Sequence, residues 1–178
     1  MALRLLRPDD APALGAYFEG LSAATRRVYA PHAFDMETAA RICAESDLEQ
    51  TLRFVAVSAV AAPAAVAIVA YIIVRLTPGP SEVQRYAAAG IDLDPDSTFY
   101  LAPSVADDYQ SRGAGTSLME PVLVWLRQLG CQRLVLSGGV RAENARAKRF
   151  YTKLGFRRIG DFRTQGDVDN HDMLLDLS

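Results

Sequence analysis

The sequence predicts a protein of the α/β (α+β) class that forms a single domain over residues 1–178, and three observations support this prediction. The length is sufficient for one domain with a sizeable core and short for two. Apolar runs rich in β-branched residues occur beside segments whose apolar residues recur at the spacing of a helix face. A glycine-containing turn joins an apolar run at 99–105 to a helical pattern at 116–129, so a strand, a turn and a helix follow one another.

The N-terminal third is predicted to be mainly helical. After a short strand at 3–7, the Pro-Asp-Asp segment at 8–10 is typical of a helix start, because proline fits the first turn and acids there interact favourably with the helix dipole. A second short helix is expected at 22–28, and Asp35 is the expected N-cap of a third helix that ends at Ala44. The first helix has a core-facing stripe at helical spacing, formed by Leu14, Tyr17, Phe18 and Leu21.

Residues 55–74 contain no charged side chain, and as a helix they would be long enough to span a bilayer. Pro63 lies in the middle of this stretch, and β-branched residues are abundant on both sides of it. These features favour two buried strands, at 52–60 and 66–76, joined by an Ala-Pro turn. The membrane-spanning alternative is therefore disfavoured, and we expect no association with a membrane.

The C-terminal half continues with alternating strands and helices. A strand is predicted at 133–140, followed by a helix at 143–154 that ends at a glycine, and then by two strands at 156–162 and 172–177 that form a hairpin. Pro121 conflicts with the predicted helix that contains it, because proline inside a helix removes one backbone hydrogen bond and costs about 3 kcal/mol unless a kink accommodates it.

Composition and charge argue against several classes of function. The formal net charge of −2 argues against nucleic-acid binding, which usually requires a basic surplus. The two cysteines, Cys43 and Cys131, cannot form a disulfide framework, so they indicate a reducing compartment and are expected to be buried. Charged side chains precede any long apolar run near the N-terminus, so no signal peptide is predicted and a cytoplasmic location is expected. The two histidines, His32 and His171, and the cysteines lie far apart, so no metal is expected.

The segment 110–115, with the sequence Gln-Ser-Arg-Gly-Ala-Gly, is the main candidate for a binding site. The first N–H groups of a helix have no partner within it and carry partial positive charge, and glycines let the backbone approach a bulky anion. A diphosphate group fits such a site. The spacing differs from the dinucleotide-binding fingerprint, whose first glycine is absent here, and from the P-loop, because no Gly-Lys-Ser/Thr follows.

This loop resembles the acyl-CoA pyrophosphate loop of the GNAT superfamily of N-acetyltransferases. A second segment, at 140–156, resembles the other signature of that superfamily. It has an asparagine, an alanine, an aromatic-tyrosine pair and a Leu-Gly-Phe ending, which are Asn144, Ala147, Phe150, Tyr151 and 154–156. The resemblance implies a GNAT-type mixed, mostly antiparallel twisted sheet of about 6–7 strands with splayed central strands, flanked by about four helices.

The resemblance also implies an activity, that of an acetyl-CoA-dependent N-acetyltransferase that passes the acetyl (acyl) group directly to a primary amine. Acetyl-CoA would be a co-substrate whose pyrophosphate is held by the glycine loop. The loop residues with this implied role are Gln110, Ser111, Arg112, Gly113, Ala114, Gly115 and Thr116. By the same resemblance, the backbone of Val105 pairs with the pantetheine arm. Asn144 contacts that arm or positions the start of its helix, and Tyr151 points its hydroxyl toward the thioester sulfur.

The acceptor stays open at this point, because a small-molecule amine and a protein or peptide amine are both possible. The oligomeric state also stays open between a monomer and a homodimer. Three basic side chains either meet the 3′-phosphate of coenzyme A or form a solvated helix face, and they are Arg146, Arg149 and Lys153. Four aromatic side chains either wall an acceptor pocket or belong to the core, and they are Tyr17, Phe18, Tyr29 and Phe34.

Acyl transfer needs a neutral amine, which a base or desolvation can provide, and a proton for the leaving thiolate. A lysine-type amine with a pKa of about 10.4 costs about 4.6 kcal/mol to deprotonate at pH 7, whereas a tyrosine stays protonated at that pH and can protonate the leaving thiolate. Many GNAT proteins have a glutamate on the strand before the glycine loop, but the strand at 99–105 contains no acid. No substitute stands out among six candidates, which are Glu19, His32, Glu82, Asp96, Asp107 and Asp108. This departure leaves an alternative of a different class, a non-catalytic acyl-CoA-binding module with a regulatory or sensor role.

Overall fold

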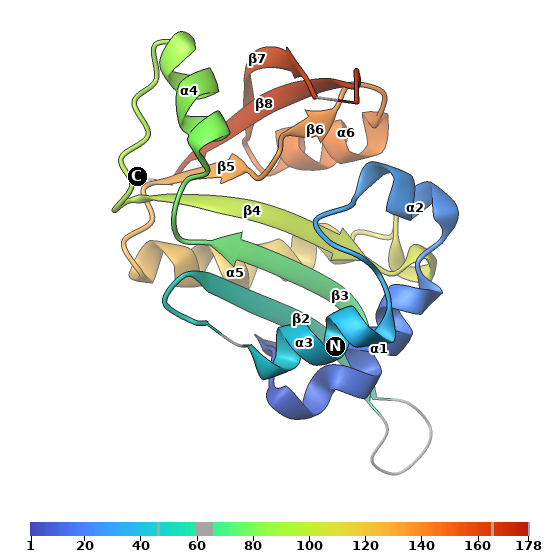
Figure 1. Ribbon diagram of the computed structural model, residues 1–178. Helices are drawn as coiled ribbons and strands as arrows, with labels where there is room; N and C mark the ends of the chain where they lie inside the picture. The colour runs from blue at the N-terminus through green and yellow to red at the C-terminus, as the bar shows by residue number, and fades with distance from the viewer. Residues whose placement is uncertain (46, 60–65, 165, 178) are drawn as a thin grey trace. The chain divides into compact units, whose positions relative to one another are not determined.

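The computed structural model describes four stretches of the chain (Figure 1), which are residues 1–45, 47–59, 66–164 and 166–177. These residues form eight strands and six α-helices. The chain is divided into two compact units, namely 1–73 with 103–118, and 74–102 with 119–178. The expectation of a single domain over residues 1–178 stays a prediction.

The first unit is built on four neighbouring strands, which are β1 (Ala2–Leu5), β2 (Thr51–Ala59), most of β3 (Val66–Arg75) and the end of β4 (Thr98–Val105). β1 is antiparallel to β2, with Ala2 opposite Val57. Just beyond β4, the amide of Ala106 donates to the carbonyl of Val69 on β3 at 2.9 Å. Branched side chains pack well on such pleated surfaces, and one buried cluster of this unit consists of Ala56, Val69, Ala70 and Leu118.

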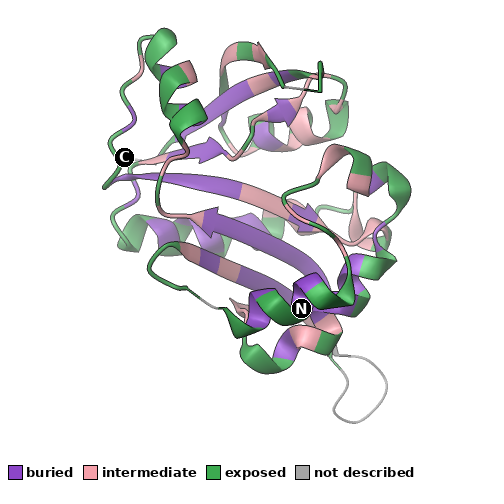
Figure 2. Ribbon diagram, viewed as in Figure 1, coloured by how far each residue is buried: buried purple, intermediate pink, exposed green. Residues whose placement is uncertain are grey.

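Three helices cover this sheet in sequence order, which are α1 (Ala11–Gly20), α2 (Ala23–Val28) and α3 (Met36–Ala44). Two of them start at side-chain caps, because Ser22 Oγ accepts a hydrogen bond from Thr25 N and Asp35 Oδ1 accepts one from Thr38 N. The expected core stripe of α1 is confirmed, since all of its residues are at most 5% exposed (Figure 2), namely Leu14, Tyr17, Phe18 and Leu21.

An ion pair between the half-buried Arg4 and the buried Asp10 fastens β1 to the turn before α1. The two terminal nitrogens of Arg4 donate to the two carboxylate oxygens of Asp10 at 2.6 and 2.7 Å, and the amide of Arg7 donates to Asp10 Oδ2 at 2.8 Å. The hydrogen bond from Arg4 holds the pKa of Asp10 below its ordinary value. A carboxylate with a lowered pKa in the folded state stabilises the fold above its unfolded pKa, and this contribution is lost as the pH falls through the folded pKa.

We therefore expect Asp10→Asn to lower the free energy of unfolding at pH 7 by about 3 kcal/mol, because it leaves Arg4 without its partner. The deficit should shrink as the pH falls below about 4, because the carboxyl in the unfolded wild-type chain then becomes protonated, while the folded one keeps its charge down to its lowered pKa. Urea denaturation of both proteins at pH 7 and pH 3 measures this. A deficit of the same size at both pH values would contradict the prediction.

The second unit continues with strands that neighbour one another in the order β4, β5 (Arg133–Leu136), β8 (Asp169–Asp176) and β6 (Val140–Arg141), while β7 (Arg157–Arg163) also pairs with β8. β4 and β5 are parallel, and all pairs made by β8 are antiparallel. The helices are α4 (Pro80–Ala88), α5 (Ala114–Gln128), which enters this unit at Met119, and α6 (Ala145–Lys153). A buried cluster of this unit consists of Tyr86, Leu93, Tyr100, Val135 and Leu174.

The predicted fold class, a mixed and mostly antiparallel sheet with flanking helices, is confirmed. The described residues form more strands and helices than the expected 6–7 strands and about four helices. The additional strand is β6, because Gly138 and Gly139, both at φ 70°, interrupt the single strand predicted at 133–140. The additional helices are short ones with caps or a proline in the first turn, such as α4, whose first residue is Pro80.

The charge-free stretch at 55–74 does not form a membrane-spanning helix where the structure describes it. Its residues 55–59 lie in β2 and its residues 66–74 lie in β3. The described parts of the chain contain no helix with the length and apolar character needed to cross a bilayer. The Ala-Pro turn expected between the two strands lies outside the described residues.

Pro121 lies inside α5, as the sequence predicted. Because Pro121 has no N–H, the carbonyl of Ser117, four residues earlier, has no helical donor. Both residues are exposed. Water can therefore bond to this carbonyl, which reduces the cost of the proline.

Candidate functional site

The glycine loop lies in the first unit, between β4 and α5. Within the described part of the chain, the amides of residues 111–116 have no backbone hydrogen-bond partner. The next amide, that of Ser117, makes the first bond of α5 by donating to the carbonyl of Gly113 at 3.2 Å. This run of N–H groups lies at the N-terminus of a helix, and its binding to an anion stays a prediction.

Two residues of the loop have left-handed backbone conformations. Ser111 has φ 59° and Gly113 has φ 83°, a region that side chains with a Cβ rarely adopt. A Cβ built on Gly113 would have no other atom within 4 Å. The backbone conformation, and not a lack of space, is therefore what requires glycine at position 113.

The side chain of Gln110 holds the loop in place. Its Nε2 donates to the carbonyl of Val105 at 2.8 Å and to Thr25 Oγ1 at 3.3 Å. In this structure Gln110 thus positions the loop against the end of β4 and against α2. The same bond occupies one acceptor position of the Val105 carbonyl, while a second lone pair of that oxygen remains.

Asp107, a candidate base, is committed to a structural role. Its two oxygens accept hydrogen bonds from Ser22 N at 3.0 Å, Ser22 Oγ at 2.7 Å and Thr25 Oγ1 at 2.7 Å. These bonds tie the start of α2 to the segment before the glycine loop. A carboxylate used in this way is poorly suited to take a proton from a substrate.

In the second unit, Asn144 is the N-cap of α6. Its Oδ1 accepts a hydrogen bond from the amide of Ala147 at 3.0 Å, which satisfies one of the helix's first N–H groups. The position of Asn144 in the motif therefore has a local structural reason. A contact with pantetheine stays a prediction.

Tyr151 lies on the buried face of α6 and is 9% exposed. Its ring centroid lies 5.1 Å from that of Phe150 and 5.4 Å from that of Phe156. Burial raises the pKa of the phenol well above its ordinary value. The Tyr151 hydroxyl therefore stays protonated across the physiological pH range and can act as a proton donor.

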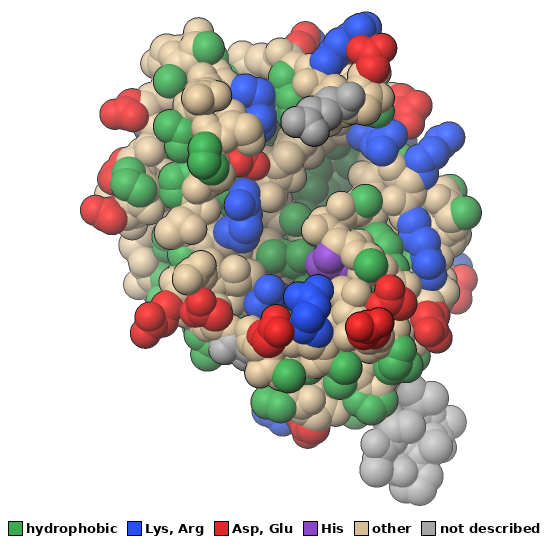
Figure 3. All heavy atoms as spheres, viewed as in Figure 1, with side chains coloured by type: hydrophobic (Ala, Val, Ile, Leu, Met, Phe, Trp, Pro, Cys, Tyr) green, Lys and Arg blue, Asp and Glu red, His purple; other side chains and the backbone are tan. Residues whose placement is uncertain are grey.

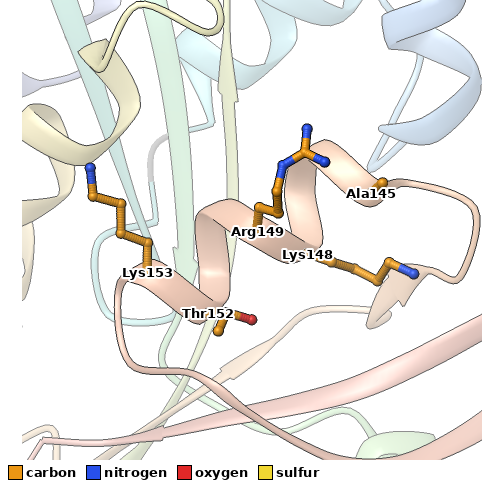
Figure 4. Close-up of a pocket in the computed structure, with 5 residues that line it drawn as sticks. All are labelled: Ala145, Lys148, Arg149, Thr152 and Lys153. Carbon is orange, nitrogen blue, oxygen red and sulfur yellow. The ribbon is translucent and has the colours of Figure 1, made fainter.

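The exposed face of α6 is basic. A shallow pocket there is lined by Ala145, Lys148, Arg149, Thr152 and Lys153. Figure 4 shows that Arg149 and Lys153 extend from the same side of the helix. Lys148 extends elsewhere and donates to the carbonyl of Ala142. Arg149 and Lys153 can therefore bind a phosphate group together, or they can remain solvated.

The cysteines and histidines have structural surroundings. Cys43 and Cys131 are both buried, as predicted, and burial raises the pKa of each thiol to about 11, so neither is a thiolate at neutral pH. His32 Nδ1 lies 2.7 Å from the carbonyl of Ala33, and burial lowers its pKa. His171 Nδ1 lies 2.6 Å from the carboxylate of Asp161.

The remaining candidate residues separate into core and surface. Tyr17 and Phe18 are buried core residues, whereas the rings of Tyr29 and Phe34 are only half-buried and stack with their centroids 5.9 Å apart. Three of the candidate bases are exposed, and they are Glu19, Asp96 and Asp108.

Glu82 was one candidate among six in the sequence, and the structure distinguishes it by burial. It is only 6% exposed although it lies next to a Pro-Gly-Pro-Ser loop. The sequence also gave no indication of the buried pair Arg85–Asp172, whose bonds measure 2.8 and 3.0 Å. The only available signal for Glu82 was its place in the first turn of a short helix.

No group of three metal-binding side chains occurs among the described residues. Figure 3 shows Lys and Arg side chains beside Asp and Glu side chains on the displayed face, in keeping with the net charge of −2. This mixture differs from the basic stripe that nucleic-acid binding requires.

Solved structures with a similar fold cover nearly the whole chain. The ribosomal-protein-S18-alanine N-acetyltransferase of Escherichia coli is 23% identical, with a TM-score of 0.65 over 99% of this chain and 94% of that one. Salmonella typhimurium yncA, a putative acetyltransferase solved with its cofactor acetyl-CoA, is 17% identical, with a TM-score of 0.68 over 99% and 94%. Aminoglycoside acetyltransferase AAC(6')-Ib, solved in complex with coenzyme A, is 19% identical, with a TM-score of 0.70 over 98% and 94%.

At these identities the solved structures show a shared fold. No match was found among curated protein sequences. The family model described as Acetyltransferase (GNAT) family matches residues 26–156, which include the glycine loop, Asn144 and Tyr151. The chain therefore belongs to the GNAT family of acetyltransferases and is an acyltransferase.

Proposed function

We propose that this acyltransferase moves an acetyl group from acetyl-CoA to a primary amine by direct transfer within a ternary complex. The observation that carries the proposal is the run of amides at 111–116, which have no backbone hydrogen-bond partner among the described residues, begin a helix and include a glycine at φ 83°. Such a run offers several charge-assisted hydrogen bonds to a diphosphate at no cost in broken protein contacts.

The roles proposed for individual residues come from the resemblance to GNAT proteins, and the surroundings of these residues are compatible with them. The amides of 111–116 hold the pyrophosphate, and Gln110 keeps this loop against Val105. The backbone of Val105 pairs with the pantetheine arm. In the second unit, Asn144 fixes the start of α6, and the hydroxyl of Tyr151 protonates the thiolate as the C–S bond breaks.

We further propose that Arg149 and Lys153 contact the 3′-phosphate of coenzyme A. Replacing both by alanine should weaken coenzyme A binding about tenfold, because two charged contacts to one phosphate are lost. The affinity for dephospho-coenzyme A, which lacks that phosphate, should stay within twofold of wild type. Calorimetry with both ligands tests this, and an equal loss for both would assign the pair to another role.

The test of the proposed function follows thiol release from acetyl-CoA across a panel of amines, with mass spectrometry of the products. Two structural neighbours are named for a protein alanine and for aminoglycosides as acceptors, so the panel should include peptides with free N-termini, lysine peptides, polyamines and aminoglycosides. Acetylated product with any of these supports the proposal. Coenzyme A binding without thiol release would favour the acyl-CoA-binding module, and no binding at millimolar ligand would refute both.

A further inference from the structure

The structure assigns the missing base to Glu82: we propose that its carboxylate takes the proton from the acceptor ammonium. This inference rests on the proposed function, because a base is needed only if an amine is acylated. A lysine-type amine is almost entirely protonated at pH 7, and its lone pair becomes available only after a proton is removed. The strand before the glycine loop contains no acid, so a carboxylate base would lie elsewhere in the chain.

Three carboxylates are buried in the described part of the chain: Asp10, Glu82 and Asp172. Arg4 binds both oxygens of Asp10, and Arg85 binds both oxygens of Asp172. A carboxylate paired in this way gains little by taking up a proton.

Glu82 differs because its two shorter contacts fall on one oxygen. Oε1 accepts from the amide of Gly138 at 3.1 Å and from Arg75 at 3.3 Å. Within the described part of the chain, Oε2 has one hydrogen bond, from the hydroxyl of Ser81 at the long distance of 3.5 Å. One oxygen therefore anchors the side chain, and the other keeps lone pairs for a proton.

The anchor places this carboxylate at the carboxyl end of β5. The parallel ladder between β4 and β5 reaches Leu101 opposite Leu136, and the amide of Ser137 then donates to Leu101 O at 3.0 Å. Gly138, which binds Glu82, is the next residue. The carboxyl ends of parallel strands are where open α/β sheets usually bind their ligands.

Two further polar groups beside Glu82 lack partners within the described residues. The hydroxyl of Tyr100 and Nε of Arg75 are buried without a hydrogen bond, and the guanidinium of Arg75 lies 5.1 Å from the centre of the Tyr100 ring. Burial, with a smaller effect of the negative charge of Glu82, raises the pKa of Tyr100 to about 12. The neutral Tyr100 hydroxyl can thus hydrogen-bond to an incoming amine or to a water that bridges the amine to Glu82.

The backbone near Glu82 leaves room for its carboxylate. A Cβ at Gly79, the N-cap of α4, would overlap Oε2 of Glu82. The φ of Gly79 is −80°, which any residue can adopt. Glycine is therefore needed at position 79 to admit the carboxylate and not for its backbone conformation.

Each proton in the proposed step has a named donor and a named acceptor. The acceptor R–NH₃⁺ gives one proton to Glu82 Oε2, and the resulting R–NH₂ attacks the thioester carbon. When the C–S bond breaks, the thiolate takes the proton of Tyr151, and the nitrogen releases its second proton through solvent to restore Tyr151. Glu82 then returns its proton to solvent, so the products are the amide, the free thiol and one proton.

The experiment compares wild type with Glu82→Gln, which keeps the shape of the side chain, and Gly79→Ala, which displaces the carboxylate without removing it. Asp172→Asn is the matched control, because it disrupts a buried ion pair of the same unit. For the best amine of the panel, we expect kcat/KM of Glu82→Gln to fall about 100-fold or more at pH 7. The kcat/KM of this variant should then rise tenfold per pH unit up to the pKa of the amine, because without the base only amine that is already deprotonated in solution can react.

The kcat/KM of Gly79→Ala should fall at least tenfold. The kcat/KM of Asp172→Asn should stay within threefold of wild type after correction for the folded fraction. Coenzyme A binding by calorimetry should be unchanged in all three variants. Two results would overturn the assignment of Glu82 and leave the proposed function standing. One is an active wild type whose kcat/KM is within threefold of that of Glu82→Gln. The other is a loss of kcat/KM in Asp172→Asn as large as that in Glu82→Gln. A wild type that releases no thiol with any amine would overturn the proposed function and this assignment with it.

Discussion

Replacing Gly113 by valine is expected to weaken coenzyme A binding about 100-fold. Gly113 has φ 83°, and a β-branched residue is strongly disfavoured there. The variant should relieve this strain by turning the loop to negative φ, which redirects the neighbouring N–H groups. Losing two charge-assisted hydrogen bonds to the diphosphate costs about 3 kcal/mol, which corresponds to the stated factor.

Gly90 provides a matched control for this substitution. It has φ 75°, and a Cβ there would also meet no atom within 4 Å. Gly90→Val should therefore lose a similar amount of stability, about 1–3 kcal/mol, while its affinity for coenzyme A stays at the wild-type value. Thermal unfolding and calorimetry of both variants separate strain from binding. If Gly113→Val binds coenzyme A as wild type does, the glycine loop is not the pyrophosphate site.

Removing the hydroxyl of Tyr151 should have the largest effect on turnover. Tyr151→Phe keeps the ring contacts with Phe150 and Phe156 but cannot protonate the leaving thiolate. We expect kcat to fall about 100-fold or more, in the range usual for general acid catalysis. The dissociation constant for coenzyme A should change less than twofold, because the lost interaction develops only as the C–S bond breaks.

Tyr71→Phe serves as the comparison for this variant. Tyr71 is also buried, and burial raises the pKa of its hydroxyl to about 12. Its removal should leave kcat within threefold of wild type. Steady-state kinetics and calorimetry on both variants measure the two effects. Unchanged turnover in Tyr151→Phe would remove Tyr151 from the role of acid.

Features with local causes were predictable from the sequence. Asp35 was correctly expected as an N-cap, because capping depends on a side chain and an amide three residues later. For Asn144 the resemblance offered a helix start as one of two roles, and its side chain caps α6. The stripe from Leu14 to Leu21 followed from helical periodicity. The interruption between β5 and β6 was missed, because a pair of glycines is compatible with both a continuous strand and a break.

The choice among the candidate bases required contacts between residues far apart in the chain. Asp107 is bound by Ser22 and Thr25, which lie more than 80 positions earlier, whereas Glu82 is anchored by an amide 56 positions later. In the sequence both are acids beside loops, and nothing local distinguishes them.

The sequence by itself determined the family, the order of the main elements and the unpartnered amides at 111–116. These depend on short-range patterns of glycine, caps and apolar spacing, which act through neighbouring residues along the chain. Only the tertiary structure decided which side chains are buried and which of their lone pairs are already used. Desolvation and hydrogen bonding across long sequence separations govern both, so the available oxygen of Glu82 and the raised pKa of the Tyr151 phenol arise only when the chain has folded.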